Sequence, residues 1–223
     1  MFADHTVIKE SAPIHAAHPD PNGNMITMIS EYLLDNNMVH EDDRHVLDFL
    51  KRISLDINGK EIDIYTEGKV LGLLVMCAIR VEDIDGKPEV TITMRYPESI
   101  TSEQILERAS AAAERNGFEL TGYAEKDKPY ILDPDTEIVR ELVKVANSVT
   151  GSDKGPFIVG GGTYAHQLPN AYVFGSSSNR PPEDFPKGRG GAHGIDEAVS
   201  IDCLQRAMKI YARAMLKLNE MEW

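Results

Sequence analysis

The sequence has few cysteines, fewer basic than acidic residues, and no long hydrophobic run. Its two cysteines, Cys77 in an apolar stretch and Cys203 near the start of the last expected helix, suit reduced, buried thiols better than a disulfide framework. Lys and Arg number 23 against 36 Asp and Glu, and a formal charge of −13 would repel the phosphate backbone of a nucleic acid. We therefore expect neither disulfide bonds nor a nucleic-acid partner.

The longest apolar stretch lies at about residues 70–79 and is too short to cross a bilayer. The segment from Met1 to His5 lacks the basic region followed by an apolar one that a secretion signal would need. The sequence thus predicts no membrane partner, no export and a cytoplasmic location. What it does contain is 42% hydrophobic residues over 223 positions, enough for a substantial core in one or two domains.

A polar stretch at residues 125–129 separates two parts, which we take as domains of residues 1–127 and 128–223. In the first part, a strand is expected to end at residues 6–9, and a loop with His15 and His18 leads into a helix from about Asn24. A second helix is expected over residues 41–53. The apolar stripes that should cover a sheet are Ile26, Ile29 and Leu33 in the first helix, and Val46, Leu47, Leu50 and Ile53 in the second.

Two strand-like runs supply this sheet, residues 70–81 and 89–95, joined through the hairpin signal Asp85-Gly86. Apolar residues alternate with polar ones along the second run, so Arg95 should lie on the face opposite the core.

Thr101 and Gln104 predict a capping box for a helix that ends at Gly117, and residues 118–124 read as a further strand. The order strand, strand, helix, strand predicts an α+β fold, a two-layer sandwich of an antiparallel sheet with helices on one face.

In the second part, Asp133-Pro134 predicts the start of a helix, and residues 157–159 and 171–174 read as buried strands on either side of a glycine loop. A Ser-, Pro- and Gly-rich stretch at residues 176–191 is typical of a mobile or ligand-gated loop. The apolar stripes expected to pack in the core are Ile138, Leu142, Val145 and Val149 in the first helix, and Leu204, Met208, Tyr211, Met215 and Leu218 in the final helix.

Several motifs occur in an order that resembles the di-zinc amidohydrolases and exopeptidases, which include aminoacylase, carnosinase and succinyl-diaminopimelate desuccinylase. The likeness is greatest to bacterial Xaa-His or β-Ala dipeptidases. The motifs are His15-Ala16-Ala17-His18-Pro19 with Gly23-Asn24, then Met94-Arg95-Tyr96-Pro97, then Gly160-Gly161-Gly162-Thr163-Tyr164-Ala165 with Leu168-Pro169-Asn170, and His193. This family has a catalytic zinc domain interrupted by a lid domain. The chain resembles the later part of the lid, residues 1–127, followed by an α/β C-terminal segment of the catalytic domain, residues 128–223.

The resemblance implies a role for each motif. His15 would be the lid histidine that polarises the scissile carbonyl and stabilises the oxyanion. Arg95 would bind the C-terminal carboxylate of the substrate through two parallel hydrogen bonds. His193 would be a zinc ligand, with Asp196 or Glu197 as a partner of its imidazole. Backbone groups of the glycine loop would contact the substrate, and this loop comprises Gly160, Gly161, Gly162 and Thr163.

Each of these residues also has a plainer interpretation. His15 and His193 would then be loop histidines without a ligand, and Arg95 would end a strand in a salt bridge. The glycines would form a tight structural turn. Asn24 we interpret mainly as structural, because Asn near a helix start commonly caps the helix.

The sequence departs from the family in most of its metal site. The family pattern requires an upstream His-x-Asp motif, a bridging aspartate, a Glu-Glu pair whose first member is the general base, and a further acidic ligand. No Glu-Glu pair occurs, and His18-Pro19-Asp20 lies in the lid loop. A catalytic zinc needs about three protein ligands and an open position for water, which one histidine cannot supply. The acidic pairs Glu41-Asp42, Glu82-Asp83 and Glu183-Asp184 suit solvated surfaces better than metal ligation.

The resemblance therefore implies a portion of a zinc-dependent dipeptidase that lacks its N-terminal catalytic half and is inactive alone. The complete enzyme would hold a pair of zinc ions, or manganese or cobalt, which also accept imidazole and carboxylate ligands. Its substrates would be dipeptides or small peptides, and the chain could form a homodimer. Two alternatives stay open: a non-catalytic peptide-binding or dimerisation module, and an accessory half that joins a separately encoded partner.

Overall fold

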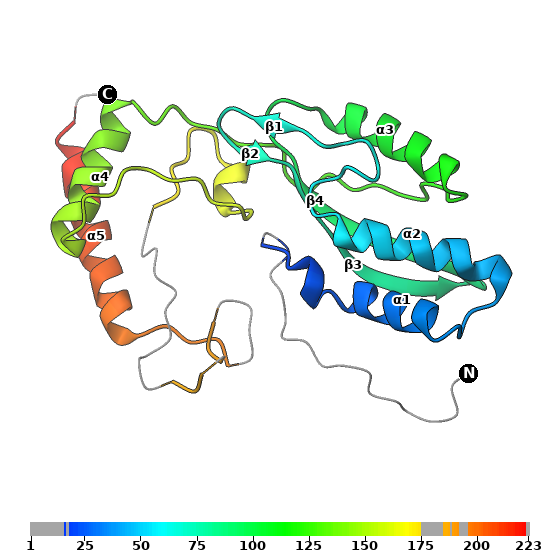
Figure 1. Cartoon of the computed structure of the whole chain (residues 1–223). Helices are drawn as coiled ribbons and strands as arrows, with labels where there is room; N and C mark the ends of the chain where they lie inside the picture. The colour runs from blue at the N-terminus through cyan, green and yellow to red at the C-terminus, as the bar shows by residue number, and fades with distance from the viewer. Residues whose placement is uncertain (1–15, 17, 175–184, 188, 192–195, 222–223) are drawn as a thin grey trace. The chain divides into compact units, whose positions relative to one another are not determined.

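The computed structural model describes residue 16 and residues 18–174, 185–187, 189–191 and 196–221. The expected strand end at residues 6–9, His15, His193 and most of the loop at residues 176–191 lie outside the described residues. Helices and small antiparallel sheets make up the chain (Figure 1), so the fold is α+β, as predicted. The chain divides into two compact units, unit 1 over residues 1–129 and unit 2 over residues 130–223.

A long hairpin forms the main sheet of unit 1. Strand β3, Val75–Ile84, pairs antiparallel with β4, Lys87–Arg95, and sets Met76 opposite Met94. Between them Asp85 and Gly86 have φ of 52° and 78°. Positive φ at both central residues matches the twist of a two-residue hairpin, and Asp-Gly tolerates it. The predicted hairpin is therefore confirmed.

The first predicted strand begins too early in the sequence. Residues 67–73 form a separate small hairpin of β1, Glu67–Gly68, and β2, Gly72–Leu73. The backbone amides of Val70 and Leu71 at its tip donate to the carboxylate of Glu98, at 2.8 and 3.3 Å. The apolar run from Val70 did not predict the start of the strand correctly. Its first residues form a turn instead, which the Glu98 carboxylate holds.

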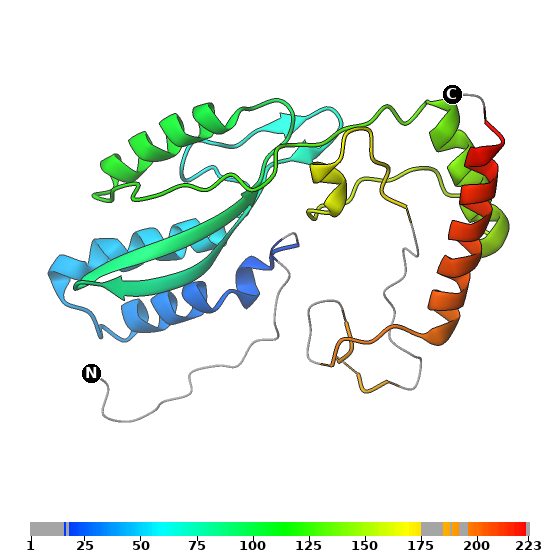
Figure 2. The same ribbon diagram turned by 180° about the vertical axis from the view of Figure 1, so that it is seen from behind.

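Helices α2, Arg44–Leu55, and α3, Ser102–Arg115, cover the core face of the β3–β4 hairpin (Figure 2). The core cluster comprises Phe49, Ile53, Ile62, Ile64, Leu74, Met76, Ile100, Ile105 and Ala112. Burial of these apolar side chains is the main stabilising term of this unit. Along α2, Leu50 and Ile53 are buried as predicted, whereas Val46 and Leu47 are half-buried.

The predicted capping box of α3 is confirmed. The Thr101 hydroxyl accepts from the Gln104 amide, and the Gln104 side chain accepts from the Thr101 amide. Gly117, just after the helix, has φ of 77°, the left-handed conformation of a helix end.

The strand predicted over residues 118–124 is wrong, because these residues form no strand in the structure. The segment is held by side chains instead: the Phe118 ring packs at 4.8 Å from that of Phe49, and the Thr121 hydroxyl lies 3.3 Å from Glu89. A period-two pattern can place side chains on a surface without any pairing of the backbone.

Helix α1, Met25–Asp35, buries a different face from the predicted one. Its buried residues are Thr27, Ser30 and Leu34, and Ile29 is 40% exposed. The reason is that α1 packs mainly against α2, where the Thr27 hydroxyl donates to the Ser54 hydroxyl at 3.0 Å. Of the predicted stripe, Ile26 and Leu33 are half-buried and Ile29 is exposed.

Unit 2 is built on two packed helices, α4, Glu137–Thr150, and α5, Ile201–Asn219. Helix α4 begins three residues later than predicted, because Thr136 caps it by accepting from the Val139 amide, whereas Asp133 closes a preceding turn. Leu142 is buried as expected. The other three residues of the predicted stripe, Ile138, Val145 and Val149, are half-buried.

The prediction that α5 packs in the core through its stripe of larger apolar residues is wrong. Met208 and Met215 are 70% and 65% exposed, and Leu204 and Tyr211 are exposed as well. The buried residues of α5 are Cys203, Ala207, Ile210 and Ala214. Small side chains let two helices approach closely, so α5 packs through this narrow face and leaves its larger apolar face outward.

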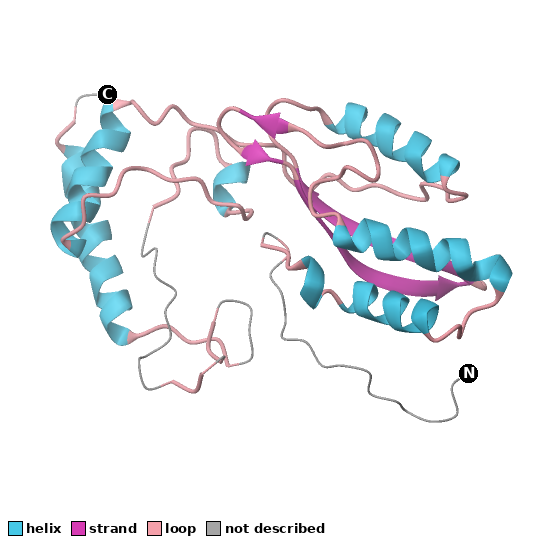
Figure 3. Cartoon of the chain, viewed as in Figure 1, coloured by secondary structure: helices cyan, strands magenta, loops and turns pink. Residues whose placement is uncertain are grey.

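The two strands predicted in unit 2 are also wrong. Residues 157–159 and 171–174 are drawn as loops in Figure 3, and Phe157 is 71% exposed. An isolated extended segment needs a neighbouring strand for its backbone groups, and the described part of unit 2 has none. Among the described residues, no helix combines the length and apolar character needed to span a membrane.

Candidate functional site

Arg95 ends strand β4 on the outer face of the hairpin, opposite the core. Its strand partner is Val75, and the neighbouring pair on the same face is Cys77 with Thr93. The side chains of Met76 and Met94 point to the core instead. Alternation along the strand therefore places Arg95 as the sequence predicted.

The guanidinium of Arg95 has an unsatisfied donor. Its Nη1 is buried and has no hydrogen-bond partner among the residues that the structure describes. A buried donor without a partner costs free energy, and a carboxylate could satisfy Nη1 and a second guanidinium nitrogen at once. The plainer interpretation of Arg95, a strand-end salt bridge, finds no carboxylate on Nη1 within the described chain.

The charge of Arg95 affects the pKa of the Cys77 thiol. Burial raises the pKa of the Cys77 thiol, and the positive charge of Arg95 acts in the opposite direction. The thiol therefore stays protonated near neutral pH, and it does not supply an anion that would neutralise the arginine. Both cysteines are thiols, Cys203 buried and Cys77 half-buried.

The backbone that follows Arg95 is held from both sides. The Tyr96 hydroxyl donates to the Glu125 carboxylate, and burial together with this hydrogen bond raises the pKa of Tyr96. Pro97 is fully buried, and Glu98 holds the tip of the β1–β2 hairpin. Gly68 lies so close to this segment that a Cβ there would stand 2.3 Å from the Glu98 carboxylate and 2.7 Å from Pro97. These contacts fix the course of the chain at Arg95.

The loop with the predicted lid histidine can be followed from His18 onward, since His15 itself is not described. Asp20 caps a short turn, Pro21–Gly23, by accepting from the Asn22 amide at 3.0 Å. Asn24 then caps α1 by accepting from the Ile26 amide at 2.9 Å, which confirms its structural role. The same side chain donates to the Ala78 carbonyl of β3 at 3.0 Å, so the end of this loop is tied to the hairpin that carries Arg95.

The glycine loop lies in unit 2 as irregular, solvent-accessible chain, with Gly160 and Gly162 exposed and Gly161 half-buried. None of the three has a positive φ, and a Cβ added at Gly161 would meet nothing within 4 Å. Thr163 caps the short helix η3, Tyr164–Gln167, by accepting from the Ala165 amide at 3.3 Å. Neither a tight turn nor close packing within the described chain requires glycine at Gly161.

The described residues do not form a zinc centre. His193 lies outside them, and Asp196, one suggested partner, forms an ion pair with Arg189. Among the residues that the structure describes, no group of three or more His, Cys, Asp or Glu could hold a metal ion. The zinc expected from the resemblance is therefore not matched by a donor set here.

The acidic pairs of the sequence do not supply metal ligands in the described residues either. Glu41, Asp42, Glu82 and Asp83 are exposed, as predicted, and Glu183 and Asp184 lie outside the described residues. The chain contains a second His-x-Asp sequence, His40-Glu41-Asp42, which was not among the predicted motifs. It lies on an exposed turn before α2, with Glu41–Asp43 as a short 3-10 helix.

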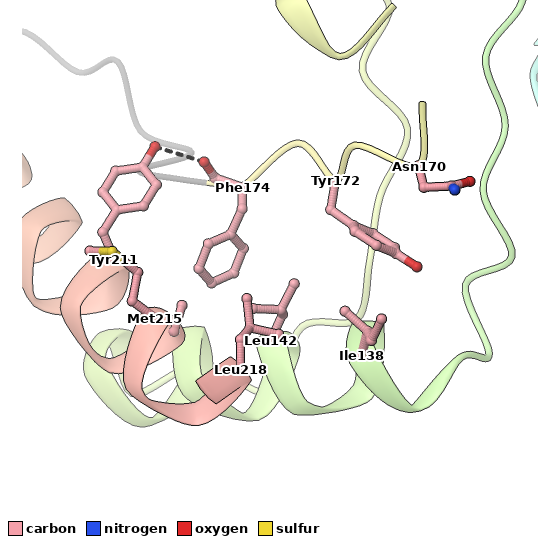
Figure 4. A pocket seen from close by; sticks show the side chains of 9 residues that line it. Ile138, Leu142, Asn170, Tyr172, Phe174, Tyr211, Met215 and Leu218 are labelled. Carbon is pink, nitrogen blue, oxygen red and sulfur yellow. Dashed lines mark hydrogen bonds between the residues drawn. The ribbon is translucent and has the colours of Figure 1, made fainter. Parts of the chain in front are cut away.

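A groove between α4, α5 and residues 170–174 was also missed from sequence (Figure 4). It has a volume of about 620 Å³, and Tyr211 closes one end by donating to the Phe174 carbonyl at 2.7 Å. Side chains from both helices and from the extended segment line it: Ile138, Leu142, Asn170, Tyr172, Phe174, Tyr211, Ala214, Met215 and Leu218. This lining suits an apolar occupant and offers no acid, base or nucleophile for catalysis. The groove was missed because the apolar stripe of α5 was predicted to be buried in the core.

Comparison with known proteins relates the chain to dipeptidases. It is 30% identical over 205 residues to the putative dipeptidase YtjP of Bacillus subtilis, covering 92% of this chain and 42% of the relative. It is 26% identical over 228 residues to the Beta-Ala-Xaa dipeptidase of Lactobacillus delbrueckii subsp. lactis, covering 99% and 45%. The putative dipeptidase SH1171 of Staphylococcus haemolyticus is 24% identical over 212 residues, covering 94% and 43%.

No protein-family model matches the chain. The chain spans less than half the length of the curated relatives it matches, 42% to 45%. The matched 92% to 99% of its own length necessarily includes both units. By sequence, the chain is similar to proteins named as dipeptidases, and the similarity extends over both of its units.

Proposed function

We propose that this chain is a portion of a metal-dependent dipeptidase, with unit 1 as part of a lid-type sandwich and unit 2 as the end of the catalytic domain. The observation that carries the proposal is the similarity to proteins named dipeptidases over 92% to 99% of the chain. A match confined to one unit would have suggested a shared module only. The match over both units favours a shared activity of the longer protein.

Arg95 is the substrate-binding residue that the geometry favours. Its Nη1 is buried without a partner among the residues that the structure describes, and the segment Tyr96–Glu98 holds the backbone behind it. A dipeptide ends in a carboxylate, which a planar guanidinium can bind through two parallel hydrogen bonds. In this proposal the missing partner of Nη1 is the C-terminal carboxylate of the substrate.

The remaining roles follow from the resemblance. His15 would donate to the oxyanion, and the backbone of Gly160 to Gly162 with Thr163 would contact the substrate. His193 is the one zinc ligand that the sequence offers, so the rest of the site would come from another part of the enzyme. Manganese or cobalt could replace zinc with the same type of ligands.

The surface of unit 2 supports an additional polypeptide as the partner. Its exposed apolar residues include Phe157 and Ile158 in an extended segment and Met208 and Met215 on α5. Another polypeptide that covered these side chains would remove apolar surface from water, which favours association. The N-terminal catalytic half, whether in the same polypeptide or encoded separately, would cover this surface; a second copy of the chain is the alternative occupant.

The proposal is tested by assaying β-alanyl dipeptide hydrolysis with zinc present. The 223-residue chain alone should show no enzyme-like turnover. Joining or mixing it with the part of the Lactobacillus relative that the alignment does not cover should yield turnover that His193→Ala abolishes. Hydrolysis by the chain alone, abolished by His193→Ala, would show that the chain is a complete enzyme instead.

A non-catalytic peptide-binding module is the second candidate, and it is favoured equally by the Arg95 Nη1, which lacks a partner among the described residues. It would bind dipeptides saturably without zinc, with affinity weakened by Arg95→Ala, and would give no turnover in any mixture. Measuring affinity and turnover on the same preparations separates the two functions.

A further inference from the structure

Asn24 uses both ends of its side-chain amide. Its Oδ1 accepts from the Ile26 amide at 2.9 Å and caps α1. Its Nδ2 donates to the Ala78 carbonyl of β3 at 3.0 Å and lies 3.9 Å from the Cys77 Sγ. One side chain thus joins the loop before α1 to a strand that is 54 residues away in the sequence.

Capping alone does not require an amide. The helices α3, α4 and α5 are capped by Thr101, Thr136 and Ser200, whose hydroxyls accept from the helix backbone. Serine and threonine serve this role about as well as asparagine. Asparagine adds an N–H donor to the capping oxygen. In this structure that Nδ2 group donates to the Ala78 carbonyl of strand β3.

The contact point on β3 is close to Arg95. Cys77 is paired with Thr93, and Arg95 is two residues further along the same face of β4. Residues 77, 93 and 95 lie on one face of the hairpin, because alternate residues of paired strands share a face. The Asn24 amide therefore meets the strand beside the group that we assign to the substrate carboxylate.

We propose that Asn24 is a positioning residue of the carboxylate site: its amide fixes the loop from His18 to Gly23 to strand β3 beside Arg95. This inference rests on the proposed binding of a carboxylate by Arg95. Without the Asn24 donor, the loop keeps its helix cap and loses its attachment to the hairpin. The loop then has more positions open to it, and binding a substrate has to order it again.

The test uses Asn24→Ser, which keeps a cap and removes the donor, with Asn24→Ala as the variant that loses both. The probe is β-alanyl-alanine, compared with its C-terminal amide, by calorimetric titration of the 223-residue chain. Asn24→Ser should unfold at nearly the wild-type temperature and bind the acid about three- to tenfold more weakly, the range expected for one lost hydrogen bond. Binding of the amide should change little. Asn24→Thr provides the same test if the serine variant does not fold.

A double variant links the effect to Arg95. In an Arg95→Ala background, Asn24→Ser should cause no further loss of affinity, because the site that it positions is already gone. Equal affinities of wild type and Asn24→Ser for the acid, or losses that simply add, would overturn the inference and leave the function standing. A wild-type chain that does not distinguish acid from amide would instead overturn the proposed carboxylate site.

The contact itself has an independent readout in the Cys77 thiol. The Asn24 amide packs against this thiol, so Asn24→Ser should speed its alkylation by iodoacetamide, followed by mass mapping of the Cys77 peptide. Cys203 is buried and serves as the internal reference. An unchanged alkylation rate would show that the Asn24 amide does not hold this position in solution, which also overturns the inference.

Discussion

In the proposed carboxylate site, Arg95 is a residue that would favour a ligand at a cost to the stability of the free protein. Its Nη1 is buried without a hydrogen bond inside the described chain, while the residues after it are held by Glu125 and by the hairpin tip. A group fixed in place and left unsatisfied favours any ligand that completes it, because the cost of ordering the group is met during folding. The free protein should therefore be less stable than it would be without the charge.

Replacing Arg95 by methionine should raise stability and abolish carboxylate binding. The apolar side chain removes the unsatisfied donor, and we expect a gain of about 1 kcal/mol in the free energy of unfolding. Urea unfolding measures the gain, and titration with β-alanyl-alanine measures the loss. Arg80→Met is the matched control, because Arg80 is exposed and paired with Glu82 at 3.1 Å. A stability loss at Arg95 would mean that its guanidinium already has a partner.

Among the elements, the β1–β2 hairpin depends on a single carboxylate. Glu98 accepts from the amides of Val70 and Leu71, and these backbone hydrogen bonds lower its pKa from the usual value of 4.5. A pKa that is lowered on folding stabilises the protein above the unfolded value. That contribution is lost as pH falls through the lowered value.

Glu98→Gln should accordingly remove part of the acid sensitivity of unit 1. Above pH 5 the variant should be less stable than wild type, because an amide is a weaker acceptor than a carboxylate. Below about pH 4 the difference should shrink, since protonation weakens the wild-type contact as well. Urea unfolding at several pH values follows both limbs. Glu107→Gln, on the exposed side of α3, is the control, and an identical pH profile for the two variants would contradict the prediction.

Helix α5 exposes the larger of its apolar faces, and this can be tested by substitution. Met208→Gln should change the free energy of unfolding by less than about 0.5 kcal/mol, as surface substitutions do. Ala207→Leu should cost about 1–3 kcal/mol, because it inserts a large side chain at a buried position of α5. The opposite ranking would restore the core role that the sequence predicted for Met208.

Some elements could be predicted from sequence because their signals are local. Asp85-Gly86 demands positive φ, and Thr101 with Gln104 satisfies backbone groups within one helical turn. The face of Arg95 followed from alternation along one strand. The failures depend on distant partners: residues 118–124 and 157–159 had strand-like patterns, but pairing requires another strand in the right place. For α5, residue size misled us, since Ala207 and Ala214 pack and Met208 and Met215 do not.

Site prediction met the same limit. The sequence placed Arg95 on the correct face, but it gave no sign that Nη1 lacks a partner in the described part of the chain or that Asn24 reaches β3. Both facts depend on contacts between segments far apart along the chain. The apolar groove of unit 2 was missed for the same reason, because the order of residues on α5 does not reveal which face its neighbour covers.

At the scale of the whole molecule, the chain is strongly acidic, but helix α5 of unit 2 contains several basic residues and exposed apolar side chains. The formal net charge is −13, whereas α5 contains Arg206, Lys209, Arg213 and Lys217 beside its exposed apolar residues. An acidic partner with apolar residues would complement this helix better than it would complement the chain as a whole.

The folded chain should bind a hydrophobic fluorescent dye below its unfolding temperature. The groove of about 620 Å³ and the exposed face of α5 provide apolar surface without unfolding. Met215→Gln should reduce the fluorescence gain by placing a polar group in the groove, and Met38→Gln, at an exposed position in unit 1, should not. Equal dye binding by both variants would place the apolar surface elsewhere. Joining the chain to its proposed partner should also reduce the signal.

The end of the β3–β4 hairpin next to its turn is weakly paired, and this weak pairing also has a benefit. Glu82 lies directly opposite Glu89, and Asp83 opposite Pro88, so like charges and a missing amide weaken the ladder there. A ribbon with open edges could recruit strands from other molecules and begin a fibril. Charge and proline at those edges repel or block such strands. The residues that loosen this tip thereby protect the protein against edge-to-edge aggregation.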